Sequence, residues 1–285
     1  KLNNNEILLL EKFTEISRVE SNILPEEINF FRKVKNFFFK KKYVDAEKSY
    51  EEIWKEKELS NYFKEEPDWN APYFKTHYYY KNKRIITRKW VFHFYITFLL
   101  SKICKANGLK TIAEVGSGNG INVIILALLS NNLKITGFEL TEAGVVSSKN
   151  AMNNDKVLQN IKKMGNHLIK TNQFIKNNTN FIKKDVVENP FKKNEYDLIF
   201  SSLALEQIPN NCEKVLENMI NGAKSHIVLF EPFLEFNDHK KSLLIKNKGY
   251  MHKRFFDIYA NKYDVGLYTL PLKFNKVNFN AGIVV

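Results

Sequence analysis

The chain has 285 residues, of which 44% are hydrophobic and 14% aromatic. This composition excludes a disordered chain, and the length allows one large domain or a domain with a helical extension. The formal net charge of +13 is compatible with nucleic-acid binding. However, the excess is mostly lysine and accompanies frequent Asn, Ile and Phe. We therefore favour AT-rich coding bias as the origin of the charge.

The two cysteines, Cys104 and Cys212, lie far apart and neither has a C-x-x-C companion. This spacing disfavours a zinc site or a disulfide framework, and it predicts a reducing, cytoplasmic compartment. The apolar run Trp90 to Leu100 contains His93 and is too short to span a membrane. The first residues lack the pattern of a signal peptide. We expect neither a metal nor a membrane partner, and the sequence does not define the oligomeric state.

Residues 1–105 are predicted to form a helical cap or substrate region. One apolar stripe at helical spacing follows Pro25, and a second runs from Tyr43 to Trp54. The aromatic residues of both stripes are expected to pack in a core. The segment 65–90 interrupts this pattern with prolines, tyrosines and basic residues, and it predicts a loop that could fold over a ligand or form a surface linker.

From residue 106 to residue 285, strands and helices alternate. This pattern predicts an α/β, doubly wound, Rossmann-like and mostly parallel sheet. The expected strands are Thr111–Val115, Lys134–Glu139, Thr179–Lys183, Tyr196–Ser201 and His226–Phe230. The expected helices are 120–130, 142–153, 157–176, 211–223 and 238–262, followed by two apolar stretches at 266–272 and 277–285.

A glycine-rich turn, TIAEVGSGNG, follows the first strand of this region. Gly116, Gly118 and Gly120 alternate with other residues, and an apolar helix comes next. Glycine permits a left-handed backbone and close approach of a ligand, and a helix N-terminus offers unpaired N–H groups. A dinucleotide fingerprint would place its third glycine at Ile121. The spacing therefore makes NAD the weaker interpretation.

The pattern G-x-G-x-G, with Glu114 two positions before the first glycine, resembles motif I of the class I S-adenosylmethionine-dependent methyltransferases. The resemblance covers roughly residues 108–235. It implies a seven-stranded sheet whose last strand runs antiparallel. It also implies that S-adenosylmethionine is the cofactor and that Glu114, Ser117 and the three glycines form part of its site.

One acidic residue ends the second strand of this region and another follows the third strand. Glu139 ends the second strand, where a carboxylate can accept hydrogen bonds from two ribose hydroxyls. Leu140 would then lie beside the adenine. The resemblance implies that Asp185 binds the adenine amino group and that the Val186 N–H meets a ring nitrogen.

The fourth strand is followed by the run LALEQIP. The family often has a histidine where this chain has Gln207, so a base at that position is in doubt. Glu206 becomes a candidate for orienting the substrate or accepting a proton, although it equally suits a residue flanking a helix start. Ser201, at the strand end, would lie near the methionine portion of the cofactor. A further match to the family is Glu231, which precedes a proline.

The segment before the domain supplies two more candidates. His77 is a second possible base, and Arg88 could hold the methionine carboxylate or an acidic substrate group. Arg84 lies in the same segment and could serve the same purpose.

The fourth strand lacks the Asn/Asp-Pro-Pro-Tyr/Phe motif of enzymes that methylate exocyclic amines of bases. Cys212 also lacks the Pro-Cys context of cytosine-C5 enzymes. We therefore predict methyl transfer to an O or N of a small polar metabolite, with a nucleotide-linked or polysaccharide-precursor sugar favoured as the acceptor. The alternatives are an RNA or protein methyltransferase and a non-catalytic cofactor-binding scaffold subunit.

Overall fold

The computed structural model describes residues 46–56, 75–80, 83–88, 90–130, 132–164, 172–237, 242–243, 263, 265–269, 272–274 and 282–284. The described helices are α3 (Ala46–Glu56), α4 (Trp90–Ala106), α5 (Ile121–Leu129), α6 (Glu142–Asn153), α7 (Asp155–Met164), α8 (Asn172–Asn178) and α9 (Cys212–Gly222), with short 3-10 turns η2 (Leu205–Gln207) and η3 (Leu234–Phe236). The helix expected after Pro25 lies outside the described residues, as does most of the one expected at 238–262.

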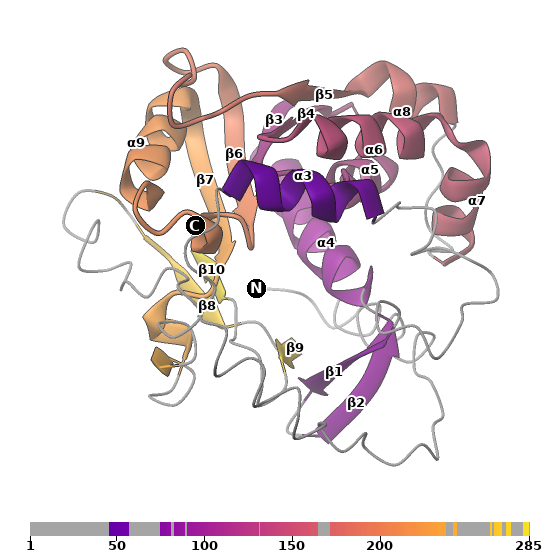
Figure 1. The fold of residues 1–285 in the computed structure, drawn as a ribbon, viewed down its shortest axis with the longest axis horizontal. Helices are drawn as coiled ribbons and strands as arrows, with labels where there is room; N and C mark the ends of the chain where they lie inside the picture. The colour runs from indigo at the N-terminus through magenta and orange to yellow at the C-terminus, as the bar shows by residue number, and fades with distance from the viewer. Residues whose placement is uncertain are drawn as a thin grey trace.

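The described strands are β1 (Lys75–Tyr80), β2 (Lys83–Arg88), β3 (Thr111–Val115), β4 (Lys134–Glu139), β5 (Thr179–Lys183), β6 (Tyr196–Ser202), β7 (Ala223–Glu231), β8 (Leu267–Thr269), β9 (Leu272–Phe274) and β10 (Gly282–Val284). Seven of them form one sheet in the order β5-β4-β3-β6-β7-β10-β8 (Figure 1). The strands β5, β4, β3, β6 and β7 are parallel, whereas β10 is antiparallel to both β7 and β8. The five parallel strands confirm the predicted doubly wound α/β sheet.

Helices cover both faces of the sheet, as the side chains of the central strands show. In β6, Leu198 and Phe200 pack with residues of α4 and α5, whereas Ile199 packs on the other face with residues of α9. All three side chains are fully buried. Alternate residues of a strand point to opposite faces, so a strand covered on both sides is apolar throughout.

A β-hairpin occupies part of the segment that the sequence analysis assigns to a loop. β1 and β2 pair antiparallel, with Tyr80 opposite Lys83, and β1 also pairs with β9 through Tyr78 and Phe274. The prediction of a loop at 75–88 is therefore wrong. The prolines of the flanking sequence obscured two runs rich in Tyr, Thr and Ile, which favour strands. The domain boundary near residue 105 stays a prediction, although this small sheet joins segments from both sides of it.

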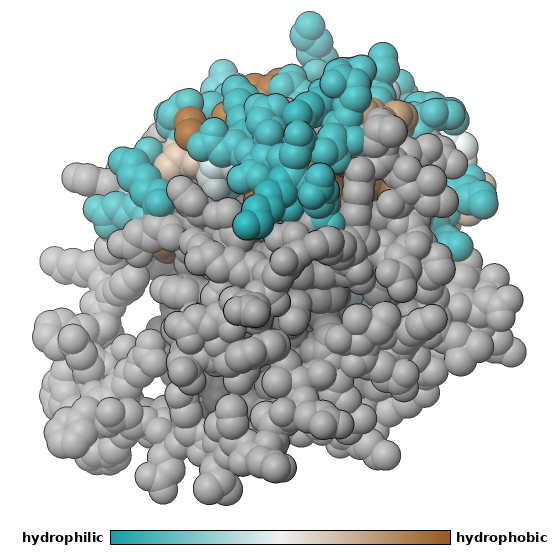
Figure 2. All heavy atoms as spheres, turned by 90° about the vertical axis from the view of Figure 1, so that its right-hand side faces the viewer, coloured by the Kyte–Doolittle hydropathy of each residue, from teal (hydrophilic) through white to brown (hydrophobic). Residues whose placement is uncertain are grey.

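The single helix expected at 157–176 is two helices, α7 and α8. Residues 165–171, between these two helices, lie outside the described part of the chain. In α7, Val157, Leu158 and Ile161 are buried. On the side of α7 and α8, the surface formed by the described residues is largely hydrophilic (Figure 2).

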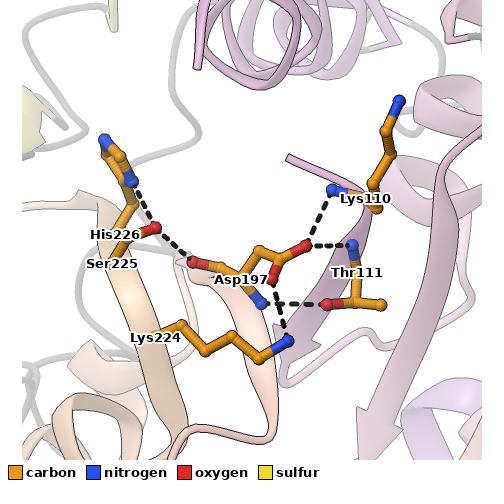
Figure 3. A network of polar contacts seen from close by, with 6 residues as sticks. All are labelled: Lys110, Thr111, Asp197, Lys224, Ser225 and His226. Carbon is orange, nitrogen blue, oxygen red and sulfur yellow. Dashed lines mark hydrogen bonds and ion pairs between the residues drawn. The ribbon is translucent and has the colours of Figure 1, made fainter. Parts of the chain in front are cut away.

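A polar network joins the amino ends of β3, β6 and β7, at the opposite edge of the sheet from the glycine turn (Figure 3). The Asp197 carboxylate accepts hydrogen bonds from Lys110 N at 2.8 Å and Thr111 N at 2.9 Å, and it pairs with Lys224 Nζ at 3.0 Å. Partial burial raises the pKa of Asp197, but these backbone hydrogen bonds and the lysine outweigh it and lower the pKa to about 2. The ionised carboxylate therefore holds three strands together.

Replacing Asp197 by Asn should lower the free energy of unfolding at pH 7 by about 1 to 2 kcal/mol, since a lowered carboxyl pKa measures how strongly the folded state favours the charged form. Because the folded-state pKa is depressed, the stabilisation is present above about pH 4 and is lost as the pH falls towards 2. Urea denaturation across this range measures the difference.

The control is Glu188→Gln, whose side chain is 69% exposed in its pair with Lys214. It should leave the stability nearly unchanged. Equal stability of Asp197→Asn and the wild type at pH 7 would contradict the role of the network.

Candidate cofactor site

A cavity of about 280 Å³ lies at the carboxyl ends of β3, β4 and β6. Its walls come from the glycine turn, the ends of β4 and β6, the turn after β5 and two helices that precede the sheet. The residues that line it include Tyr50, Trp54, His93, Gly116, Ser117, Gly118, Asn122, Phe138, Glu139, Leu140, Lys184, Asp185, Val186, Ser202, Leu203, Ala204 and Gln207. The carboxyl edge of a parallel sheet is the usual place for a ligand in this architecture.

The glycine turn is fixed to the neighbouring strand by main-chain hydrogen bonds. Gly116 N and Ser117 N donate to the same carbonyl, Phe138 O, at 2.8 and 3.0 Å. Gly116, Gly118 and Gly120 have φ values of 73°, 55° and 78°. Side chains other than glycine are strained in this left-handed region. The alternating glycines are therefore required by the backbone of the turn.

Two of these glycines also permit close contacts. A Cβ at Gly116 would lie 2.4 Å from Ala204 Cβ, on the loop after β6. A Cβ at Gly118 would lie 2.6 Å from a ring carbon of Trp54 on α3. The turn is thus wedged between the loop after β6 and the helix α3, and both of these also line the cavity.

Glu139 connects the end of β4 to the glycine turn. Its Oε2 accepts a hydrogen bond from Gly118 N at 2.9 Å, and its Oε1 accepts from Thr141 N at 3.1 Å and Thr141 Oγ1 at 2.7 Å. The residue is only 6% exposed but lines the cavity beside Leu140. The carboxylate is therefore held in one orientation at the cavity wall.

Asp185 begins the turn after β5. Its Oδ1 accepts hydrogen bonds from Val187 N at 2.8 Å and Glu188 N at 3.4 Å, which fixes the carboxylate at the cavity wall next to Val186. Lys184 lines the same region, with Nζ 4.5 Å from the centroid of the Phe191 ring. The structure thus brings the predicted pair Glu139 and Asp185 to one cavity.

The Ser117 hydroxyl is a buried polar group at the cavity wall, and its Oγ has no hydrogen-bond partner among the described residues. Ser117 is 4% exposed. This hydroxyl lies against β4, since a Cβ at Gly137 would lie 2.8 Å from Ser117 Oγ. The two fixed carboxylates, Glu139 and Asp185, are therefore the groups at the cavity wall that fit a cofactor with hydroxyl and amino groups.

Four of the predicted site residues do not line the cavity. Gly120 is packed against Phe181, since a Cβ there would lie 2.7 Å from that ring. Ser201, Glu114 and Glu206 are buried, with exposed fractions of 0%, 0% and 4%. Their neighbours in the cavity wall are Ser202, Gln207 and the glycine turn.

Glu231, at the end of β7, is hydrogen-bonded to the loop after β6. Its Oε1 accepts hydrogen bonds from Ser201 Oγ at 2.9 Å, Ala204 N at 3.0 Å and Leu205 N at 3.2 Å. Burial raises the pKa of Glu231 to about 7, although these hydrogen bonds oppose the rise. Ser201 and Glu231 therefore position the cavity-lining loop without lining the cavity themselves.

Glu114 is part of a second buried chain of polar groups. Its Oε1 accepts a hydrogen bond from Asn122 Nδ2 at 2.7 Å, and Asn122 Oδ1 is 2.8 Å from His93 Nδ1. Burial raises the pKa of Glu114 to about 8, while the hydrogen bond from Asn122 opposes the rise. Asn122 and His93 both line the cavity.

Among the cavity residues that were not predicted from the sequence are Tyr50, Trp54, Asn122 and His93. Tyr50 and Trp54 of α3 were interpreted as core residues of a helix, and nothing in the sequence placed that helix over the glycine turn. Asn122 and His93 did carry a signal, because each is a polar residue within an apolar helical run. The two candidates His77 and Arg88 lie in β1 and β2, and their side chains are outside what the structure describes.

A family model described as a methyltransferase domain matches residues 113–225, which contain the glycine turn, Glu139 and Asp185. The solved magnesium protoporphyrin IX methyltransferase (ChlM) from Synechocystis PCC 6803, with bound S-adenosylmethionine, is similar at 13% identity and a TM-score of 0.51, over 85% of this chain and 96% of that chain. The [4+2]-cyclase SpnF is similar at 13% identity and a TM-score of 0.52, over 80% and 75% of the two chains. No curated protein matches the sequence.

Residues 113–225 match a methyltransferase domain, and the comparisons support S-adenosylmethionine-dependent methyl transfer with S-adenosylmethionine as the cofactor. This assignment rests on the match to the methyltransferase domain, and the two solved structures share the fold. It sets aside the alternative of a non-catalytic scaffold.

The described residues contain no group of His, Cys, Asp or Glu side chains that could hold a metal ion. Among the described helices, none is both long enough and apolar enough to cross a membrane.

Replacing Gly116 by Ala should weaken S-adenosylmethionine binding at least tenfold, because the new Cβ would displace the Ala204 loop from the cavity wall. Gly108→Ala is a matched control, since Gly108 has a φ of 65° but an added Cβ there meets nothing within 4 Å. Both variants carry similar backbone strain, of roughly 1–2 kcal/mol. Calorimetric titration should show a loss of affinity for Gly116→Ala alone, and an equal effect in both variants would contradict the proposed steric role.

Proposed function

We propose that the protein transfers a methyl group from S-adenosylmethionine to an O or N atom of a small polar metabolite. The observation that carries this proposal is the position of α3, which brings Trp54 against Gly118 and Tyr50 to the cavity wall. A site partly closed by a helix suits a small acceptor better than a long polymer.

We assign the adenosine part of the cofactor to the carboxylates at the ends of β4 and β5. Glu139 would accept hydrogen bonds from the two ribose hydroxyls, which its remaining lone pairs allow. Both described hydrogen bonds of the Asp185 carboxylate use Oδ1, so Oδ2 is the atom that we assign to the adenine amino group. The Val186 N–H and Leu140 would complete the adenine site.

The reaction needs little covalent chemistry from the protein, since the sulfonium supplies an activated methyl group. The role of the chain is to align the attacking atom with that group and to exclude water. Alignment alone can lower a barrier by ~7–11 kcal/mol in favourable cases. A hydroxyl acceptor would also need a base, a role for which we propose His77. Glu206, the other candidate, is buried and does not line the cavity, so it would serve as a base only if the loop after β6 moved.

Within this class we favour a nucleotide-linked or polysaccharide-precursor sugar. The support is the composition of the hairpin sequence, in which β1 reads KTHYYY and β2 reads KRIITR. Aromatic and basic residues suit stacking on a sugar or base and pairing with a diphosphate. In this proposal Arg88 pairs with an acidic group of the cofactor or of the acceptor.

Replacing Glu139 by Ala should lower the affinity for S-adenosylmethionine at least tenfold. The change removes two charge-assisted hydrogen bonds, each worth about 1.5–3 kcal/mol before water compensates. Isothermal titration calorimetry measures the affinity. The control is Glu188→Ala, which removes an exposed carboxylate outside the cavity lining. Unchanged binding to Glu139→Ala would overturn the ribose assignment.

The acceptor class is tested with tritiated S-adenosylmethionine and a panel of nucleotide sugars, other small metabolites, RNA and protein. Radiolabel should transfer to a small-molecule fraction. The net charge of +13 motivates the RNA alternative, which predicts polynucleotide binding that falls steeply with salt. Transfer to RNA with that salt dependence would contradict the small-molecule proposal. The similarity to a cyclase shows why turnover, and not fold, must decide the reaction.

A further inference from the structure

The side-chain amide of Gln207 is held in one orientation at the cavity wall. Gln207 ends η2, on the loop after β6, and it lines the cavity. Its Nε2 donates a hydrogen bond to Leu203 O at 2.7 Å. A carbonyl oxygen only accepts, so the atom that faces it is the amide nitrogen and Oε1 is the acceptor that remains. Within the described part of the chain, Oε1 has no hydrogen-bond donor.

The residue that this amide contacts has an unusual backbone conformation. Leu203 also lines the cavity, and its φ of 54° lies in the left-handed region that residues other than glycine rarely adopt. Leu203 N donates to Phe230 O at 3.1 Å, so both polar groups of its main chain are hydrogen-bonded. Strained backbone of this kind is concentrated at functional sites, where the surrounding contacts enforce it. Gln207 therefore supports a strained part of the cavity wall.

This part of the wall lies on the side of the glycine turn away from the proposed adenosine contacts. In the sheet, β6 lies beside β3, whereas Glu139 and Asp185 follow β4 and β5. The end of β6 and the loop after it contribute to the cavity wall Ser202, Leu203, Ala204, Leu205, Gln207 and Ile208. None of these six side chains takes up a proton near neutral pH. This wall can position an acceptor but cannot act as its base.

The amide oxygen of Gln207 suits an amine better than a hydroxyl as the attacking group. A hydroxyl has one hydrogen and must lose it, and an amide oxygen does not remove it near neutral pH. An amine attacks with its lone pair and keeps its hydrogens during the step. Its nitrogen becomes positive as the new bond forms, so a hydrogen bond from this nitrogen to an amide oxygen is stronger in the transition state.

We infer that the methyl acceptor is an amine and that Gln207 Oε1 accepts a hydrogen bond from its N–H. The inference rests on the proposed function and narrows it, since the favoured acceptor becomes an amino sugar. The neutral nitrogen forms a bond to the methyl carbon with its lone pair, and the electron pair of the carbon–sulfur bond goes to sulfur. The products are S-adenosylhomocysteine and a methylammonium group, which then releases a proton to water. Gln207 determines acceptor specificity without acting as a base.

The first test uses pairs of nucleotide-linked sugars that differ only in an amino or a hydroxyl group at one carbon, such as UDP-glucosamine and UDP-glucose. With tritiated S-adenosylmethionine, kcat/KM should be at least about tenfold higher for the amino member, because only the hydroxyl needs a base. Mass spectrometry should locate the methyl group on nitrogen. Equal or faster transfer to the hydroxyl members would overturn the inference and leave the proposed function standing. Transfer to no small molecule would contradict both.

The second test separates contact with the acceptor from support of the loop. Gln207→Leu removes both polar atoms, whereas Gln207→Lys keeps a donor for Leu203 O and removes the acceptor atom. Both variants should lower kcat/KM for the amino sugar about 10- to 100-fold, the loss of one hydrogen bond to a group that becomes charged. Most of the loss should lie in kcat, because the bond is strongest in the transition state.

The control is Gln173→Leu, since Gln173 forms the same kind of side-chain hydrogen bond to a residue four positions away, on an exposed part of α8. It should leave kcat/KM unchanged. Calorimetry should give the same affinity for S-adenosylhomocysteine in all variants, and circular dichroism checks their folding. If Gln207→Leu does not fold, Gln207→Lys decides. An unchanged kcat/KM, or a loss that is matched by a loss of S-adenosylhomocysteine affinity, would overturn the inference.

Discussion

The hydrogen bond from Gly118 N to Glu139 Oε2, at 2.9 Å, is the contact on which the site depends. It joins the glycine turn after β3 to the carboxylate at the end of β4, so that one side chain both shapes the turn and faces the cavity. The left-handed backbone at Gly118 places that N–H in position, and Trp54 packs where a Cβ would otherwise lie. Gly118 is therefore needed for two features: the left-handed backbone of the turn and the close packing of Trp54 from α3 beside the cavity.

Near this contact, two buried carboxyl groups hold residues of the cavity wall in place through hydrogen bonds. Glu231 holds the loop after β6 through Ser201 and two main-chain N–H groups, and Glu114 holds Asn122. Burying a carboxyl group costs free energy unless hydrogen bonds compensate, and the raised pKa values of both groups reflect this cost. These hydrogen bonds fix the positions of the residues behind the cavity wall.

Much of the fold could be predicted because its signals are local. Three parallel strands, among them Thr111–Val115, were predicted with the bounds that the structure gives, since apolar runs between glycines and charges define buried strands. Glu139 was predicted from its position at the end of a strand, and Asp185 from the resemblance to the methyltransferase family. The hairpin could not be predicted in this way, because its pairing with β9 depends on residues almost two hundred positions apart in sequence. Likewise, no local sequence pattern indicates that Trp54 packs against the glycine turn, which follows the hairpin in the sequence.

The central claim is that the cavity binds S-adenosylmethionine with its adenosine at the ends of β4 and β5. A crystal structure with S-adenosylhomocysteine tests it most directly. The account predicts both ribose hydroxyls within hydrogen-bonding distance of the Glu139 carboxylate and the adenine amino group within reach of Asp185. Density for the ligand elsewhere, or for a ribose that does not contact Glu139, would contradict it.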